Sequence, residues 1–263
     1  MEVQFIDHIK KNNLFDNSHN LLLAYSAGVD SSVLFNLLLN CKYKFSVAHC
    51  NYKLRGQHSD NDQRFIIEKA KIHKVKYHTR EFDISKINFK KSQSVQMKCR
   101  QLRYKWFNEL SKKYGYDFIL TAHHLNDSIE TFFINIFRGT GIEGLTGIPI
   151  KRDKFIRPLL FATKNSILEY AKKNDVHYRE DKSNESKSYK RNKIRSDLIP
   201  IISGISENYE EIFYKSFKNL KNLSDTYKYL IKLEIQKIMT KEFDLVYLNL
   251  SKIKDLKEDN LII

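Results

Sequence analysis

Residues 21–32 read LLLAYSAGVDSS, so an apolar run leads directly into small and hydroxyl-bearing side chains. An unbroken apolar run of this length is typical of a strand buried on both faces of a parallel sheet. Residues 31–39 continue without a helix breaker and predict a helix. The turn between them therefore presents free backbone N–H groups and the positive end of a helix dipole, which together favour a phosphate group.

The composition of this turn supports a phosphate-binding role. We predict that a nucleotide phosphate is bound by Ser26, Ala27, Gly28, Val29, Asp30 and Ser31. Small side chains let the anion approach the backbone, and Asp30 could hold Mg²⁺ against the phosphates. The chain has no GxxxxGK[ST] motif and the turn has no lysine, which favours gripping a leaving pyrophosphate over γ-phosphoryl transfer. An ordinary helix N-cap is the alternative.

Strands and helices alternate from residue 21 to residue 137. Apolar runs predict strands at 21–25, 45–48, 75–82 and 118–121, and helical spacing predicts helices at 1–12, 31–39, 59–74, 94–114 and 125–137. This order predicts an α/β fold, an open parallel Rossmann-like sheet with helices on both faces. Ligands in such sheets lie where the strand order reverses, so the loops 26–31, 49–58 and 123–127 are the candidate site.

The pattern changes after residue 140. A helix is predicted at 164–173, a charge-rich polar stretch follows at 179–193, and residues 207–239 have helical spacing. We therefore predict an α/β domain with the catalytic site over residues 1–205 and a small α-helical domain over residues 206–263.

The chain is strongly basic. Its 263 residues include 46 Lys and Arg against 31 Asp and Glu, which gives a net charge of +15 and a pI near 9.5. Such a surface attracts polyanions, of which nucleic acid is the commonest. A general abundance of lysine and asparagine in the source proteome is the alternative.

Cysteine usage and hydropathy bear on the compartment. The three cysteines, Cys41, Cys50 and Cys99, form no CxxC pair, which argues against a disulfide framework and a zinc knuckle. No apolar run approaches the roughly 18 residues of a membrane span, and the N-terminus lacks the pattern of a secretory signal. We expect a cytoplasmic protein without membrane contact.

The turn and seven further blocks, which together span roughly residues 20–200, resemble the tRNA(Ile)-lysidine synthases of the PP-loop (N-type ATP pyrophosphatase) superfamily. Residues 26–32 are similar to the SGGxDS motif, with Ala27 in place of a glycine, and residues 49–55 are similar to HxNHxLR, with Tyr52 in place of a histidine. Residues 96–104 are similar to ExxARxxRY, with Gln96 in place of the glutamate and Cys99 in place of the alanine. Residues 123–131 match HHxxDxxET. Further blocks lie at 138–145, 157–160, 181–184 and 191–195. Blocks in this order are highly specific.

This resemblance implies an ATP- and Mg²⁺-dependent ligase that forms a carbon–nitrogen bond. The wobble cytidine of tRNA(Ile) with a CAU anticodon is adenylated on O2, and free L-lysine then replaces AMP at C2 to give lysidine. The anticodon then reads AUA instead of AUG. Residues 206–263 would be a tRNA-binding appendage, and whether the protein is a homodimer is left open.

Catalytic roles are assigned to Asp30, Arg100 and Asp127. Arg100 and Arg103 lie i, i+3 on the predicted 94–114 helix, and the resemblance supports Arg100 as the cation on the α-phosphate; a solvated arginine face is the alternative. Asp127 is expected across the switch point from Asp30, as a second Mg²⁺ or substrate carboxylate; a helix N-cap is its alternative. A shared metal on His123-His124 is not expected, because adjacent side chains at a strand end point to opposite sides.

Further residues are candidate binding groups. His49 and Asn51 are expected in an adenine pocket, with a buried core histidine as the alternative. Arg55, Arg103, Arg191 and Arg195 are expected to bind tRNA or substrate. Residues 182–195 hold six basic side chains, with a mobile charged loop as the alternative reading.

The sequence also bears on several other functions. Residues 139–144 read GTGIEG and match GxGxxG, but they follow a helical pattern, which argues against a dinucleotide site. A tRNA thiolase would need a cysteine pair, and small-molecule amide synthesis would not require the basic surface. A non-catalytic tRNA-binding protein remains a fourth alternative, supported only by Ala27, Tyr52 and Gln96.

Overall fold

The structure, a computed structural model, describes residues 1–84, 94–179, 190–242 and 245–248. The helices are α1 (Glu2–Lys11), α2 (Val29–Asn40), α3 (Gln57–Ile72), α4 (Val95–Tyr114), α5 (Leu125–Ile136), α6 (Ile142–Leu145), α7 (Lys164–Lys173), α8 (Lys190–Lys193), α9 (Ile199–Ile205) and α10 (Tyr209–Ile238). The strands are β1 (Leu21–Ala24), β2 (Phe45–Asn51), β3 (Lys76–Glu81), β4 (Phe118–Leu120), β5 (Lys151–Arg152), β6 (Phe155–Ile156), β7 (Met239–Glu242) and β8 (Leu245–Leu248).

The main sheet has the strand order β3-β2-β1-β4-β6-β5. All neighbours pair in parallel except β5 and β6, which form an antiparallel hairpin. The chain moves outward from β1 through β2 to β3 and then returns to the other side of β1 as β4. The order therefore reverses between β1 and β4, and the predicted parallel α/β fold is confirmed. The β5–β6 hairpin was not predicted, because strands of two residues carry no readable period.

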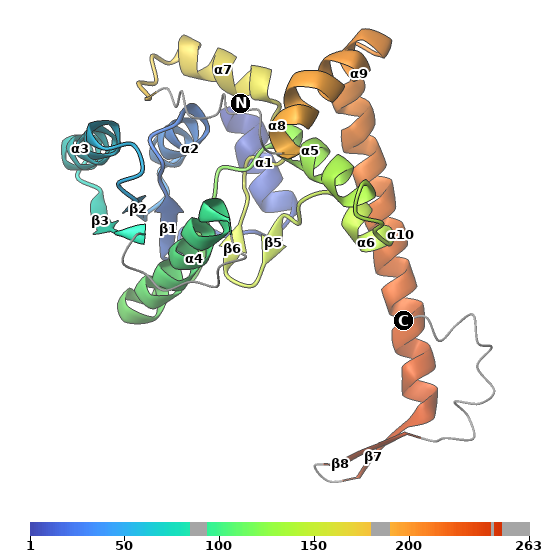
Figure 1. Cartoon of the computed structure of the whole chain (residues 1–263). Coiled ribbons are helices and arrows are strands. Elements are labelled where there is room, and N and C mark those ends of the chain that lie inside the picture. Colours follow the sequence, from blue (N-terminus) through green and yellow to red (C-terminus); the bar gives the residue numbers. More distant parts are fainter. Residues whose placement is uncertain (85–93, 180–189, 243–244, 249–263) are drawn as a thin grey trace.

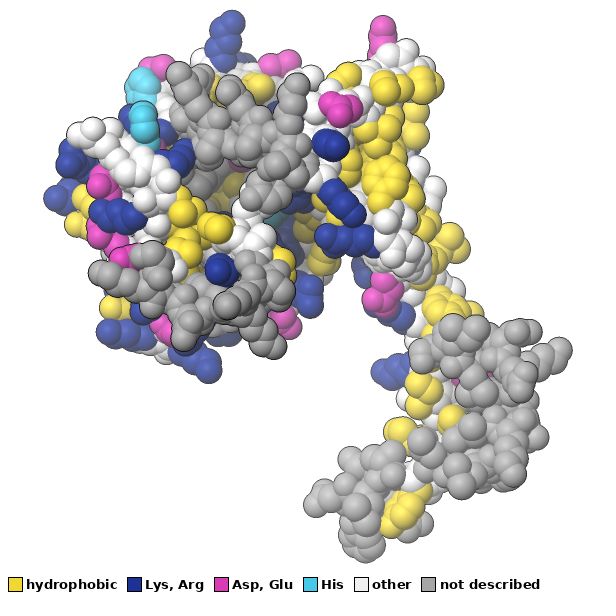
Figure 2. Space-filling view, in the orientation of Figure 1, with side chains coloured by type: hydrophobic (Ala, Val, Ile, Leu, Met, Phe, Trp, Pro, Cys, Tyr) yellow, Lys and Arg dark blue, Asp and Glu magenta, His cyan; other side chains and the backbone are white. Residues whose placement is uncertain are grey.

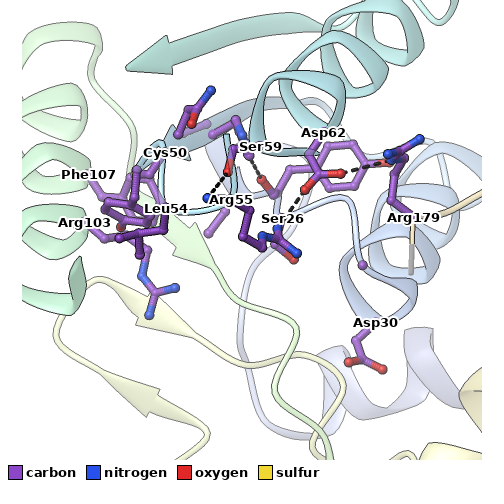
Figure 3. Close-up of a pocket in the computed structure, with 17 residues that line it drawn as sticks. Ser26, Asp30, Cys50, Leu54, Arg55, Ser59, Asp62, Arg103, Phe107 and Arg179 are labelled. Atoms are coloured by element: carbon purple, nitrogen blue, oxygen red, sulfur yellow. Dashed lines mark hydrogen bonds and ion pairs between the residues drawn. The ribbon is translucent and has the colours of Figure 1, made fainter. Parts of the chain in front are cut away.

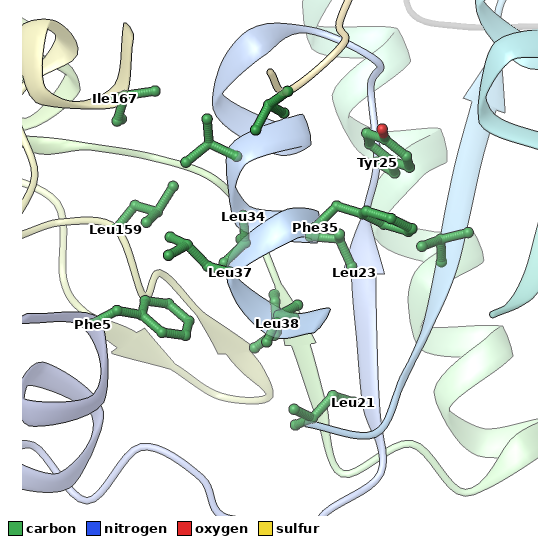
Figure 4. Packing of buried hydrophobic residues seen from close by; sticks show 14 of the residues in the cluster. Phe5, Leu21, Leu23, Tyr25, Leu34, Phe35, Leu37, Leu38, Leu159 and Ile167 are labelled. Carbon is green, nitrogen blue, oxygen red and sulfur yellow. The ribbon is translucent and has the colours of Figure 1, made fainter. Parts of the chain in front are cut away.

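Helices cover both faces of this sheet (Figure 1). One face packs against α1, α2, α3 and α7 through a large apolar cluster, in which Leu34, Phe35 and Leu37 of α2 are fully buried (Figure 4). The opposite face packs against α4 through Trp106 and Phe107. Burial of α2 on the sheet fixes the turn that precedes it, and so the fold positions the candidate phosphate site.

The long helix α10 leaves the body of the molecule and ends in the β7–β8 hairpin (Figure 1). Its first turns pack on α5, where Phe213 and Phe217 contact Phe132 at ring-centroid distances of 5.5 and 5.7 Å. Gly147 makes this approach feasible, because its φ is +76° and a Cβ there would lie 3.1 Å from the Ser128 side chain. The division into domains at residue 205 remains a prediction from sequence.

The described residues contain no helix that combines the length and the apolar character needed to cross a bilayer.

His8 on α1 makes the packing of this helix sensitive to pH. Its ring lies 5.0 Å from that of Phe161, and its Nε2 is buried without a hydrogen-bond partner. Burial, together with the charge of Lys11, lowers the pKa of His8 to about 4. The unfolded chain binds this proton near the ordinary histidine pKa and the folded chain does not, so stability is lost as the pH falls from about 6.5 toward 4.

We expect His8→Phe, which keeps the ring contact and cannot bind a proton, to lose less stability than the wild type between about pH 7 and pH 5. Urea unfolding at both pH values measures the difference. The control is His177→Phe, because the His177 side chain is 76% exposed. Equal losses in His8→Phe and the wild type would contradict the prediction.

Candidate active site

The turn between β1 and α2 is held by its own side chains. The Oγ of Ser31 donates to the carbonyl of Gly28 (3.0 Å) and lies 3.1 Å from the Oγ of Ser26. Ala27 is buried and has a φ of +69°, the left-handed region that alanine adopts at a cost of about 1–2 kcal/mol. Burial of the Ala27 methyl group offsets part of that cost.

Three helix N-termini converge on this turn. Helix α2 begins after Gly28, α5 after His124 and α7 after Thr163. The Asn126 side chain joins two of them, because its Oδ1 accepts the backbone N–H of Lys164 at 2.8 Å. Convergent helix dipoles favour an anion at this place.

A cavity of about 560 Å³ opens beside the turn (Figure 3). It lies at the carboxyl ends of β1 and β2 and is lined by residues of the turn and by the segment that follows β2. Ser26, Gly28, Asp30, His49, Asn51, Arg55 and Arg103, all predicted from sequence, are among its lining residues.

His49 offers this cavity a hydrogen-bond acceptor. Its Nδ1 lies 2.9 Å from the carbonyl of Tyr25, to which it donates, and its Nε2 is buried without a partner. Burial lowers the pKa of His49, so the ring is neutral at pH 7 and Nε2 can accept from an exocyclic amine such as that of adenine. By contrast, the Asn51 amide bonds to Asp60 (2.9 Å) and to the N–H of Lys53 (2.9 Å), so its contacts are with its own loop.

Asp62 lines the same cavity and binds two arginines that also line it. Its buried carboxylate accepts from Arg55 (2.8 Å) and from Arg179 (3.0 Å), as the dashed lines in Figure 3 show. The backbone N–H of Arg179 in turn donates to the carbonyl of Ala27 at 2.9 Å. The segment after α7 therefore stabilises the phosphate turn through this backbone hydrogen bond.

Two carboxylates meet at the switch point. The Nε2 of His124 lies 3.9 Å from Oδ1 of Asp30 and 3.6 Å from Oδ2 of Asp127. Burial raises the pKa of Asp127, but His124, His123 and the backbone N–H of His124 outweigh it, so the net pKa lies below the ordinary value. His123 contacts Thr121 instead (2.9 Å), so the two adjacent histidines have different partners.

Asp30 and Asp127 are carboxylates of the kind that could hold a magnesium ion together with phosphate. Mg²⁺ is usually held by one or two carboxylates together with waters and substrate phosphates. Within residues 1–84, 94–179, 190–242 and 245–248, no three His, Cys, Asp or Glu side chains are grouped to hold a metal by themselves. A metal at Asp30 and Asp127 would therefore need further ligands, such as waters and substrate phosphates.

A second cavity, of about 460 Å³, shares Asp30 with the first. It is lined by Asp127, Glu130, Lys164, Arg191 and Arg195, among others. Glu130 is 2% exposed and lies 2.6 Å from Nη2 of Arg195 and 3.0 Å from Nε of Arg191. Burial raises the pKa of Glu130, and the hydrogen bond from Arg195 opposes that rise.

The PP-loop domain family matches residues 1–202. The tRNA(Ile)-lysidine synthase of Chlorobaculum tepidum is 36% identical over 230 residues, which cover 85% of this chain and 67% of that protein. The chain belongs to the PP-loop family, among the tRNA(Ile)-lysidine synthases. The turn at residues 26–31 is the candidate phosphate site of this domain, and we refer to it as the PP-loop.

Other PP-loop relatives are longer than this chain. The tRNA(Ile)-lysidine synthase of Bacteroides thetaiotaomicron is 33% identical over 92% of this chain and 57% of its own length. That of Porphyromonas gingivalis is 36% identical over 83% of this chain and 49% of its own length. The chain therefore spans about half the length of these curated relatives. The U34-tRNA thiolase NcsA of Methanococcus maripaludis, with a TM-score of 0.67 and 17% identity over 83% of this chain and 78% of that one, shares the fold.

The arginines that were expected to bind phosphate, tRNA or substrate lie at different places in the structure. Arg103 lines the first cavity, and Arg191 and Arg195 line the second. Arg100 lines neither; it is exposed on α4, where its guanidinium lies 4.7 Å from the Tyr104 ring and bonds to the Tyr104 hydroxyl. Residues 182–189, also part of the expected binding segment, lie outside the described residues.

Sequence reasoning missed several residues around the PP-loop. From sequence alone, Lys164 marks only the start of a predicted helix, and Glu130, Asp62 and Arg179 carry no signal of a role at the site. Each acts through a partner far away in sequence, such as Arg179 with Asp62, and no local motif signals such a pairing.

Proposed function

We propose that this protein is a cytoplasmic ATP-dependent ligase that joins free L-lysine to C2 of the wobble cytidine of tRNA(Ile) bearing a CAU anticodon. The observation that carries this proposal is the meeting of two cavities at Asp30 beside the PP-loop. One cavity can take the adenosine of ATP and the other an amine. The reacting groups would then be held on either side of one carboxylate cluster.

In the first step, O2 of the cytidine attacks the α-phosphorus of ATP, and the bond to the bridging oxygen breaks with release of pyrophosphate. The backbone N–H groups of the PP-loop and the α2 dipole favour the phosphates. His49 accepts from the adenine amine, and Arg103 is the cation in this cavity that can approach the α-phosphate. Mg²⁺ held by Asp30 and Asp127 would neutralise charge on the phosphates.

In the second step, the ε-amine of lysine attacks C2 of the adenylated base and AMP leaves. The second cavity presents carboxylates and guanidiniums together, which is the charge pattern that a zwitterionic amino acid requires. We assign the α-carboxylate of lysine to Arg191 and Arg195 and its α-ammonium to Glu130. The ε-amine is then free to face Asp30 and the activated base.

The substrate RNA is a polyanion, and the protein carries a net charge of +15. On the face seen in Figure 2, Lys and Arg side chains gather where the body meets α10. Basic side chains near the cavities suit phosphate-backbone contacts that position an anticodon loop. A single-stranded loop allows one base to leave its stack at low cost.

Incubation with radiolabelled lysine, ATP and total tRNA tests this proposal. We expect label to enter one tRNA species and to depend on ATP. Omission of tRNA should also abolish ATP–pyrophosphate exchange, since the base is the nucleophile. Absence of label from tRNA, with binding of tRNA intact, would favour a non-catalytic RNA-binding protein.

A further inference from the structure

Lys164 supplies a cation to a phosphate site that has none in its own loop. Its Nζ lies 2.5 Å from Oδ1 of Asp30, across 134 positions of sequence. Asp30 lines both cavities, and Lys164 lines the second. The ammonium is therefore at the junction where the triphosphate of ATP would pass from the PP-loop toward the attacking base.

Several contacts fix Lys164 at this place. The hydroxyl of Thr163 caps α7 by accepting the N–H of Ser166 at 3.1 Å. The N–H of Lys164 itself donates to Asn126, whose amide donates to Glu210 of α10 at 2.6 Å. The first turns of α5, α7 and α10 thus hold the base of the lysine side chain, while its four-carbon stem leaves the ammonium free to move.

The pairing with Asp30 changes when a metal and nucleotide bind. An ammonium and Mg²⁺ compete for the same carboxylate, because both need its negative charge. The Lys164 side chain is 37% exposed, so the ammonium can move away without unfolding α7. The nearest new source of negative charge is the triphosphate at the PP-loop.

We propose that Lys164 is the pyrophosphate-binding cation of this site: its ammonium neutralises Asp30 in the free protein and binds the β- and γ-phosphates once Asp30 turns to the metal. This inference rests on the proposed function. When the bond between the α-phosphorus and the bridging oxygen breaks, its electron pair stays on the pyrophosphate, and Lys164 stabilises that charge without transferring a proton.

Three variants test the role of Lys164. Lys164→Gln removes the charge, Lys164→Arg keeps it, and Lys172→Gln removes an exposed charge from the other end of α7. Binding of inorganic pyrophosphate is measured by calorimetry in the presence of Mg²⁺, the condition in which Asp30 would release Lys164. Binding of Mn²⁺ alone is measured by its magnetic resonance signal. Neither readout depends on catalysis.

We expect Lys164→Gln to bind pyrophosphate about 10-fold more weakly than the wild type, or worse. The same variant should bind Mn²⁺ more tightly, because no ammonium competes for Asp30. Lys164→Arg should retain most of the pyrophosphate affinity, and Lys172→Gln should match the wild type in both. Opposite shifts in one variant distinguish this role from damage to the fold.

Unchanged pyrophosphate binding in Lys164→Gln would overturn the inference, provided that the wild type incorporates lysine into tRNA. Equal losses of pyrophosphate and Mn²⁺ binding in both Lys164 variants would also overturn it, since they would indicate a structural role. If the wild type itself neither binds pyrophosphate nor incorporates lysine, that result contradicts the proposed function, and with it the role of Lys164 that rests on it.

Discussion

Replacement of Asp30 by alanine is expected to lower tRNA-dependent ATP–pyrophosphate exchange by at least about 100-fold, because it removes a carboxylate on which both the metal and Lys164 depend. Asp30 is in the first turn of α2, directly within the PP-loop. Binding of tRNA should persist, because the basic surface that attracts RNA is unchanged. Exchange of radiolabelled pyrophosphate into ATP, together with a tRNA filter-binding assay, measures both quantities.

The loss should not come from unfolding. The Asp30 and Lys164 side chains are 31% and 37% exposed, and ion pairs of that exposure contribute at most about 1 kcal/mol to stability. Asp30→Asn, which keeps the size and removes the charge, should fail in the same way. Asp175→Asn is the matched control, because the Asp175 side chain is 92% exposed. Exchange at the wild-type rate in Asp30→Ala would refute the metal role of Asp30.

The sheet and its switch point could be predicted because their causes are local. The apolar run at β1, the breaker-free helix α2 and the next three strand–helix repeats each leave a periodic pattern in the sequence. Parallel strands and right-handed crossovers then leave few topologies. This reasoning was enough to expect residues 26–31 and Asp127 at one edge of the sheet, where the structure places them.

The partners within the site could not be predicted, because they depend on tertiary packing. Lys164 reaches Asp30 only because α7 packs beside α2. Arg179 reaches Asp62 and Ala27 only after the chain has passed over the sheet. Similarly, a π-helical turn at Ile194–Leu198 accompanies the pairing of Arg191 and Arg195 with Glu130, and no sequence pattern marks such a turn. The i, i+4 spacing of Arg191 and Arg195 by itself predicts only that the two side chains share a helix face.

Arg195→Ala is the second substitution with a large expected effect, and its effect is on stability as well as function. Glu130 is buried. Its pKa is raised because burial disfavours the carboxylate more than the hydrogen bond and charge of Arg195 stabilise it. Without Arg195, only Arg191 remains beside this charge. We expect a loss of about 2 kcal/mol, below the usual cost of breaking a buried pair because Arg191 and water compensate in part, and a melting temperature lower by about 5 °C.

Glu130→Gln should behave differently from Arg195→Ala. The neutral amide avoids the cost of burying a carboxylate, and the half-exposed arginines can return to water, so we expect a change of less than about 1 kcal/mol. The double variant should recover most of the stability that Arg195→Ala loses. Lys215→Ala, which breaks an exposed pair with Glu211 on α10, should cost less than about 0.5 kcal/mol and serves as the control.

The pH dependence of the free energy of unfolding is an independent test of the stability loss in Arg195→Ala. A carboxyl group whose folded pKa is raised contributes stability below its unfolded pKa and loses that contribution as the pH rises through the folded pKa. Removal of Arg195 raises the folded pKa of Glu130 further, so the deficit of Arg195→Ala should be greatest near neutral pH and shrink in acid. Urea unfolding across that range measures it, and a deficit that grew in acid would contradict this account. Arg195→Ala, Glu130→Gln and the double variant should all lose lysine incorporation. Removal of both charges restores stability, but it also removes the side chains proposed to bind the amino acid.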